Sequence, residues 1–183
     1  MTLLPFCLSL YNMAASVLFD KKQRFWVGEA LETSENLAER FFQVDLEDYN
    51  RFPFDLQTLA HLREPEKTGR ALAQVCKYEY KKEELSQKVR KKSFYRICLQ
   101  DDKILETASK DTASLLKPLL LYVVAHELIH VIRFSMEPRK FHLSPNEREM
   151  EEKSVHRMTY DLLKSVKVPK IEILLERYRP LGI

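Results

Sequence analysis

The sequence predicts an α+β domain that is mainly helical, and three observations carry this prediction. Only three glycines occur in 183 residues, which favours helices over tight turns. The run Leu119–Phe134 is apolar on nearly every side, as in a buried helix. Ser93–Leu99 alternates in polarity and is rich in β-forming residues. We expect residues 1–183 to form a single domain, because a chain of this length can bury a substantial core.

The N-terminal half is expected to be mostly helical. Residues 1–19 are apolar but lack a basic n-region and include Ser9 and Asn12, so a packed helix is favoured over a signal peptide or a membrane span. Thr33–Val44 follows the pattern of an amphipathic helix, and Phe54–Leu62 and Thr68–Tyr80 also look helical. We expect residues 1–50 to form an N-terminal helical extension of the core.

Charge and cysteine content exclude several classes of protein. The segment Lys77–Lys92 is rich in Lys and Arg, but the net charge of the whole chain is only +3. A solvated surface is therefore favoured over a specific nucleic-acid site. Cys7, Cys76 and Cys98 are odd in number and lack C-x-x-C spacing, so they indicate neither a disulfide framework nor a thiolate zinc site. We expect a reducing compartment, the cytoplasm.

A β-hairpin is predicted directly before the apolar helix. In this interpretation Ser93–Leu99 is the first strand, residues 100–103 form the turn, and Ile104–Thr107 returns. Two roles stay open for such a hairpin. It could offer an edge strand to an extended peptide substrate, or it could simply cover the helix. Pro118 fits the first turn of the helix that follows.

The apolar helix contains the motif His126-Glu127-Leu128-Ile129-His130. Histidines at positions i and i+4 share one face of a helix and can bind the same Zn²⁺. Glu127 lies beside them, where its carboxylate could take a proton from a water on the metal. Polar groups in a buried helix cost free energy unless they are partnered, which favours a functional role. The motif therefore predicts His126 and His130 as metal ligands and Glu127 as the catalytic base.

A second helix is predicted after Ser144, and it supplies candidates for a third ligand. Ser144, Pro145 and Glu147 have the spacing of an N-cap, a first-turn proline and a capping box. An apolar face follows at helical spacing, at Val155, Met158, Leu162 and Val166. Glu151 and Glu152 flank this face on opposite sides. Periodicity alone does not choose between these two glutamates as the third ligand.

Taken together, the two motifs resemble the gluzincin family of zinc metallopeptidases. The resemblance covers about residues 93–165 and implies a zincin-like metallopeptidase core there. Aligning the family's Leu-Leu pair with Leu162-Leu163 implies that Glu152 is the third ligand of one Zn²⁺. The family's Asp or Asn after that ligand falls here on His156, which becomes the candidate for hydrogen bonding to a ligand imidazole. The short chain is similar to minigluzincins and to compact peptidases of the ImmA/IrrE type.

Three functions remain, and the first is a zinc metallopeptidase acting on peptides or proteins. His156, Tyr160 and Tyr178 are candidates for stabilising the oxyanion, and either chain terminus could hold such an enzyme latent across its cleft. The second is a zinc-stabilised interaction or regulatory module without turnover. The third is a ferritin-like di-metal carboxylate protein, since Glu127 and His130 form an E-x-x-H pair. A second such pair is missing from the sequence.

Overall fold

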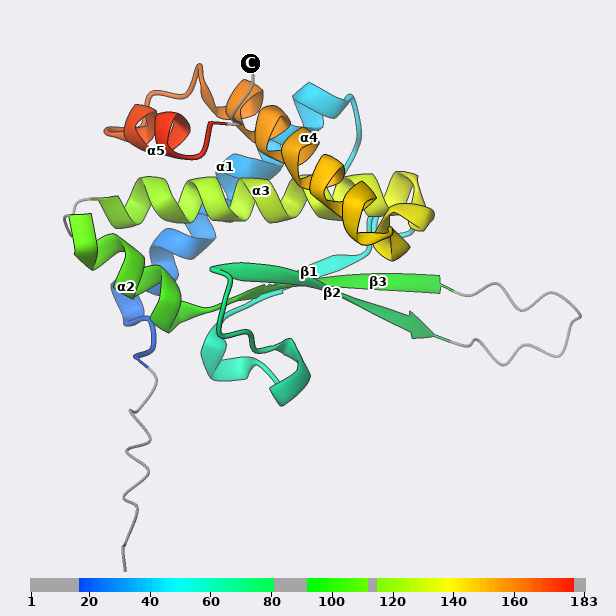
Figure 1. The fold of residues 1–183 in the computed structure, drawn as a ribbon, viewed down its shortest axis with the longest axis horizontal. Helices are drawn as coiled ribbons and strands as arrows, with labels where there is room; N and C mark the ends of the chain where they lie inside the picture. Colours follow the sequence, from blue (N-terminus) through cyan, green and yellow to red (C-terminus); the bar gives the residue numbers. More distant parts are fainter. Residues whose placement is uncertain (1–16, 81–91, 112–114, 180–183) are drawn as a thin grey trace, which may run out of the picture.

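The fold is α+β and mainly helical, with a small three-stranded sheet (Figure 1). The computed structural model describes residues 17–80, 92–111 and 115–179. Its α-helices are α1 (Lys21–Phe42), α2 (Asp101–Asp111), α3 (Leu116–Met136), α4 (Pro145–Leu163) and α5 (Ile171–Arg177). Its strands are β1 (Phe54–Gln57), β2 (Ala73–Tyr80) and β3 (Lys92–Leu99). Short 3₁₀ helices span Leu59–His61, Glu64–Glu66 and Pro138–His142.

Helix α3 lies at the centre of the molecule, with the sheet on one side and α4 and α5 on the other (Figure 1). It contacts all four other α-helices and two of the strands. This explains why the helix is apolar nearly all round. By length and hydropathy α3 could cross a membrane, but 78% of its most apolar window is buried inside the protein, as in the core helix of a soluble protein.

Strand β3 is the middle strand of the sheet, which has the order β1-β3-β2. It pairs parallel to β1 and antiparallel to β2, so that Leu56 and Val75 both lie opposite Ile97. Tyr95, Ile97 and Leu99 face the main core, whereas Cys98 packs with Leu59 and Leu62 on the other face. Strand β2 pairs on one side only within the described residues, so it forms an edge of the sheet.

The predicted hairpin over residues 93–107 is wrong in its second half. Residues Asp101–Asp111 form helix α2, and β3 instead pairs with the upstream strand β2. Asp101 accounts for this difference, because its carboxylate accepts hydrogen bonds from the backbone N–H groups of Phe19 (3.0 Å) and Leu59 (2.8 Å). Ile104 and Ala108, four residues apart, are then buried on one helical face.

Two helices predicted upstream are also wrong. Phe54–Leu62 contains strand β1 and a 3₁₀ turn, and Thr68–Tyr80 contains strand β2. Short apolar runs fit either a strand or a helix, and here pairing with β3 decided between the two. The expected helix over Thr33–Val44 is part of a longer one, since α1 begins at Lys21 after the N-cap Asp20, whose carboxylate accepts from the Gln23 backbone N–H at 2.8 Å.

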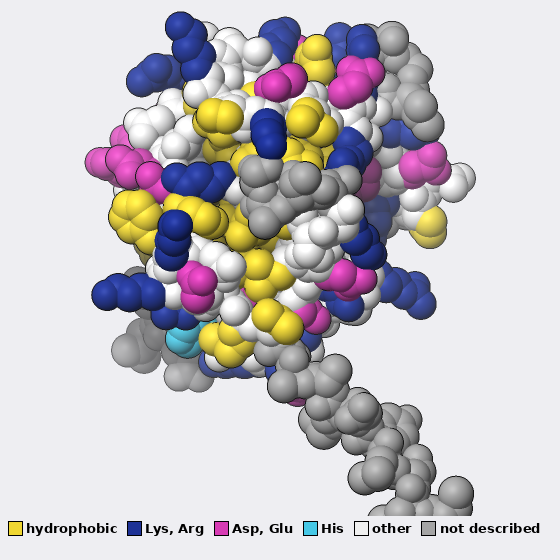
Figure 2. Space-filling model, turned by 90° about the vertical axis from the view of Figure 1, so that its left-hand side faces the viewer, with side chains coloured by type: hydrophobic (Ala, Val, Ile, Leu, Met, Phe, Trp, Pro, Cys, Tyr) yellow, Lys and Arg dark blue, Asp and Glu magenta, His cyan; other side chains and the backbone are white. Residues whose placement is uncertain are grey.

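The two ends of the described chain both contribute to the core. Helix α1 packs along α3 and buries Val27, Ala30 and Ala38, so it is more than an extension of the core. Helix α5 buries Ile171, Leu174 and Leu175. The helix expected within residues 1–19 lies almost wholly outside the described residues, as does most of the basic segment 77–92. On the face shown in Figure 2, Lys and Arg side chains are interspersed with acidic and hydrophobic ones.

Candidate metal centre

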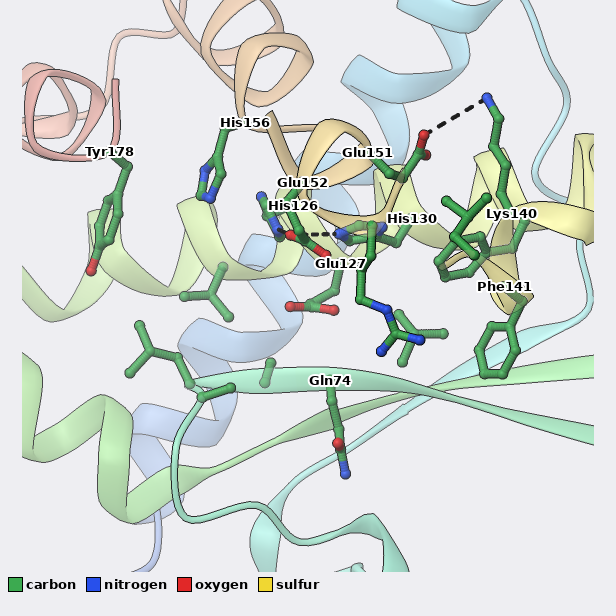
Figure 3. Close-up of a pocket in the computed structure, with 18 of the residues that line it drawn as sticks. Gln74, His126, Glu127, His130, Lys140, Phe141, Glu151, Glu152, His156 and Tyr178 are labelled. Carbon is green, nitrogen blue, oxygen red and sulfur yellow. Dashed lines mark hydrogen bonds and ion pairs between the residues drawn. The ribbon is translucent and has the colours of Figure 1, made fainter. Parts of the chain in front are cut away.

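His126 and His130 lie one helical turn apart on the side of α3 that faces α4. Both residues are buried, with 9% and 6% of their surface exposed, and their ring centroids are 4.9 Å apart. The Nδ1 atom of each ring is buried and has no hydrogen-bond partner among the described residues. Both Nε2 atoms point to one carboxylate from the neighbouring helix, that of Glu152 (Figure 3).

The distances between these three groups suit metal binding better than direct hydrogen bonding. Oε2 of Glu152 lies 3.4 Å from Nε2 of His126 and 3.3 Å from Nε2 of His130. Strong hydrogen bonds between charged groups are shorter, about 2.7–2.9 Å. Donor atoms placed about 2.0–2.1 Å from a tetrahedral Zn²⁺ would be separated by about 3.3 Å. Both separations from the Glu152 oxygen therefore match those between ligands of a tetrahedral metal.

The neighbouring Glu151 is engaged elsewhere. The Arg133 guanidinium donates to both of its carboxylate oxygens, at 2.7 Å from one Nη atom and at shorter range from Nε. Nζ of Lys140 lies 3.9 Å away from the same carboxylate. Of the two glutamates that periodicity left open, Glu152 is thus the one whose carboxylate lies beside both histidines.

Glu127 points from α3 into the space between that helix and β2 (Figure 3). Burial raises its pKa to about 7, and the nearby negative charge of Glu152 adds to this shift while His130 opposes it. Among the described residues, neither Glu127 nor Glu152 forms an ion pair with Lys or Arg. A cation bound by the histidines and Glu152 would favour the ionised form of Glu127 and lower its pKa.

The protonation of the other groups follows from the same surroundings. Burial lowers the pKa of His126 to about 4, and contact with Glu152 offsets this only in part. Burial also acts against a charge on His130, but Glu152 and Glu127 outweigh it and raise the pKa of that residue. Burial alone would raise the pKa of Glu152, yet its contacts with the two histidines hold it well below the ordinary range. Glu152 is therefore an ionised carboxylate near neutral pH, as a metal ligand must be.

His156 lies at the same site, one helical turn after Glu152. Potential ligand atoms of His126, Glu152 and His156 all lie within 4.8 Å of one another. Nδ1 of His156 is 2.7 Å from the hydroxyl of Tyr122. Tyr160, the other candidate proposed for this region, packs against the hydrophobic core and does not line the cavity at the site.

These groups open onto a cavity of about 580 Å³ between α3, α4 and β2. One end is aromatic, where Tyr122 and Tyr178 stack with ring centroids 4.7 Å apart. The other end contains the apolar side chains of Phe134, Phe141 and Leu143. The opposite wall is formed by residues 71–75, which run into β2. The volume lies in the range of sites that bind small ligands or short peptide segments.

The sequence interpretation missed Tyr122 and Arg133, and each left a detectable signal. Tyr122 precedes His126 by four residues and therefore shares its helical face. Arg133 is a cation in a buried helix, so an acidic partner on a neighbouring element was to be expected. Tyr178 was named only as an oxyanion candidate, and it lines the cavity from the end of α5.

The geometry alone supports several chemical roles. The site combines a carboxylate and imidazoles at metal-binding distances, a second carboxylate beside them, and a cavity that reaches both. Comparisons with protein-family models, curated proteins and solved structures find no match for this chain.

Proposed function

We propose that this protein is a zinc-dependent metallopeptidase with a zincin-like fold. His126, His130 and Glu152 would bind one Zn²⁺, and Glu127 would act as the general base. The observation that carries this proposal is the position of Glu152 Oε2, 3.3–3.4 Å from both Nε2 atoms, with Glu127 close to His130 and Glu152.

The residues present fit zinc in their chemistry and their charge. Two imidazoles and one carboxylate are a common ligand set of catalytic zinc, and three protein ligands leave one position open. Among the described residues, neither Glu127 nor the half-exposed Glu152 has a Lys or Arg partner, and a divalent cation would balance both charges. When bound, zinc would polarise the scissile carbonyl and make water more acidic.

Within this site Glu127 would carry the proton. Its carboxylate would accept a proton from water as the water oxygen adds to the scissile carbonyl carbon. It would then donate that proton to the nitrogen of the leaving amine as the C–N bond breaks. The pKa of Glu127, raised by burial and lowered by a neighbouring cation, suits both directions of transfer near neutral pH.

An extended peptide is the substrate that the cavity suits best. Residues 71–75 line it beside the edge strand β2. Figure 3 shows the Gln74 side chain pointing away from α3, so this wall offers backbone groups and the apolar side chains of Ala71, Leu72, Ala73 and Val75. A peptide could add to that edge by main-chain hydrogen bonds. The strand first considered for this role, residues 93–99, is the central strand and is paired on both sides.

A cytoplasmic location is also proposed. Cys76 and Cys98 are free thiols. They lie on adjacent strands, and free thiols persist in a reducing compartment.

Metal analysis combined with a peptidase assay tests the function. The purified protein should contain about one zinc per chain and should cleave a mixed peptide library, with new N-termini identified by mass spectrometry. Glu127→Gln should retain the zinc and lose cleavage, whereas His126→Ala should lose both. His142→Ala is the matched control, because His142 is exposed and does not itself line the cavity. Cleavage that survives in Glu127→Gln would contradict the proposed mechanism.

A zinc-stabilised module without turnover is the second candidate, and the proximity of His156 to the ligands favours it. It predicts zinc binding in the wild type and no Glu127-dependent cleavage. A ferritin-like di-metal site has less support, because the two carboxylates and the histidines form one cluster of donors, whereas two metal ions would need two.

A further inference from the structure

We propose that His156 is a fourth protein ligand of the metal, so that the resting centre is closed and a substrate must displace this imidazole. The inference rests on the proposed zinc site and concerns its regulation. A tetrahedral zinc with four protein ligands has no position left for water, which distinguishes structural from catalytic zinc sites.

The first support is the position of His156. It follows Glu152 by four residues on α4, so both side chains leave the same helical face. A ring nitrogen of His156 lies within 4.8 Å of the ligand atoms of both His126 and Glu152. The His156 ring centroid is 4.5 Å from that of His126, closer than the 4.9 Å between His126 and His130. A modest side-chain rotation would bring His156 to the separation of about 3.3 Å expected of zinc ligands.

The second support is the hydrogen bond with Tyr122. The Tyr122 hydroxyl lies 2.7 Å from Nδ1 of His156, which leaves Nε2 as the nitrogen available to a cation. An outer partner on the second ring nitrogen is a usual feature of metal-binding histidines, because it fixes the ring orientation. Among the three histidines of the site, His156 is the one with such a partner in the described residues, since Nδ1 of His126 and of His130 has none.

The third support is that His156 can move away from the metal. Its surface exposure is intermediate, and it lines the cavity, unlike the buried His126 and His130. Figure 3 shows the His156 side chain projecting from α4 between Tyr178 and His126. A peptide entering the cavity could therefore displace His156 and leave three ligands in place. This explains how one set of residues can bind zinc tightly at rest and still open a position for chemistry.

Counting the imidazoles on the metal tests the inference directly. X-ray absorption on the zinc-loaded full chain should show three imidazoles in the wild type and two in His156→Ala. Zinc affinity, measured by competition with a chromophoric chelator, should fall at least about tenfold in His156→Ala. His142→Ala should keep three imidazoles and the wild-type affinity, and Tyr122→Phe should keep three imidazoles with a weaker affinity.

Cobalt substitution provides a second, spectroscopic measurement of whether a position on the metal is open. Wild-type protein loaded with Co²⁺ should have a visible spectrum that barely changes on adding azide, because no position is open. His156→Gln, which preserves much of the side-chain volume, should bind azide with a clear spectral shift. Two imidazoles in the wild type, or free azide binding by its cobalt form, would overturn the inference. Failure of the proposed function has a different signature, namely absence of zinc or cleavage that does not depend on Glu127.

Discussion

Glu151 and Glu152 are adjacent in sequence, yet the structure gives them separate tasks that paired substitutions can separate. Glu151 forms a two-pronged ion pair with Arg133, whereas Glu152 faces the histidines. We predict that Glu151→Ala destabilises the fold and leaves zinc binding nearly intact. Glu152→Ala should weaken zinc binding and leave the stability of the metal-free fold nearly unchanged.

The size of each effect follows from burial. The side chains of Arg133 and Glu151 are 15% and 9% exposed, and removing one partner of a buried ion pair costs about 3–5 kcal/mol. We expect about 3 kcal/mol for Glu151→Ala, because the freed guanidinium can partly reach water. The Glu152 side chain is 45% exposed, so its loss should change the stability of the metal-free protein by less than about 1 kcal/mol.

For metal binding the larger effect should come from Glu152→Ala and the smaller one from Glu151→Ala. Loss of an outer hydrogen-bond partner already weakens a metal site by about 10–100-fold, so loss of the Glu152 ligand should weaken zinc binding by at least about 100-fold. Glu151→Ala should change the zinc affinity by less than about tenfold, since its carboxylate faces Arg133.

Urea unfolding with a chelator present measures the first effect, because bound zinc would otherwise add its own stabilisation. With a urea dependence of about 2 kcal/mol per molar, the midpoint of Glu151→Ala should fall by about 1.5 M. Chelator competition measures the second effect. Glu149→Ala is the control for both, because the exposed Glu149 pairs only with Lys153 in the described structure. Loss of zinc in Glu151→Ala with unchanged stability would falsify the assignment of the two roles.

Three further predictions concern the base, the core and the ion-pair network under the sheet. Glu127→Gln should lower peptide cleavage by about 10²–10⁴-fold while zinc content stays at the wild-type level, as elemental analysis would show. Ile129→Ala should lower the free energy of unfolding by about 2–5 kcal/mol in urea titrations, because Ile129 is fully buried on α3. Glu66 is buried, which alone would raise its pKa, but hydrogen bonds from Tyr78 and Arg96 hold it below 4.5. Its ionised form therefore stabilises the fold above about pH 4.5, and this contribution should fade as the pH drops further, an acid sensitivity that Glu66→Gln should reduce.

The site was more predictable than the fold because its signals are local. The spacing of His126 and His130 on one helix needs no tertiary information, and the capping residues of α4 fix where that helix begins. Periodicity could not choose between Glu151 and Glu152, because that choice depends on where Arg133 lies on the neighbouring helix. The position of His156 beside His126 likewise depends on how α3 and α4 cross.

The errors in the fold have one physical origin. The segment of strand β2 was expected to be helical, and residues 104–107 of helix α2 were expected to be a strand; both segments are short. In short segments the local preference is weak, and long-range contacts decide the structure. For β2 the deciding contact is its pairing with β3. For α2 the deciding contacts are the two hydrogen bonds that the Asp101 carboxylate accepts from the backbone N–H groups of Phe19 and Leu59, which are distant in sequence. Neither contact is visible from sequence pattern alone.

The packing of α4 on α3 both stabilises the fold and assembles the site. Val155 is fully buried in the main core, and it lies three residues after Glu152 and one residue before His156. The contact that buries Val155 therefore fixes the direction of both donor side chains. A shift of α4 by one residue would rotate its surface by about 100° and would move Glu152 away from His126 and His130. The same shift would expose Val155 and break the ion pair between Glu151 and Arg133. Any alternative register of α4 thus loses core burial, an ion pair and the donor geometry together. The packing that stabilises the fold therefore also keeps Glu152 beside His126 and His130 of α3.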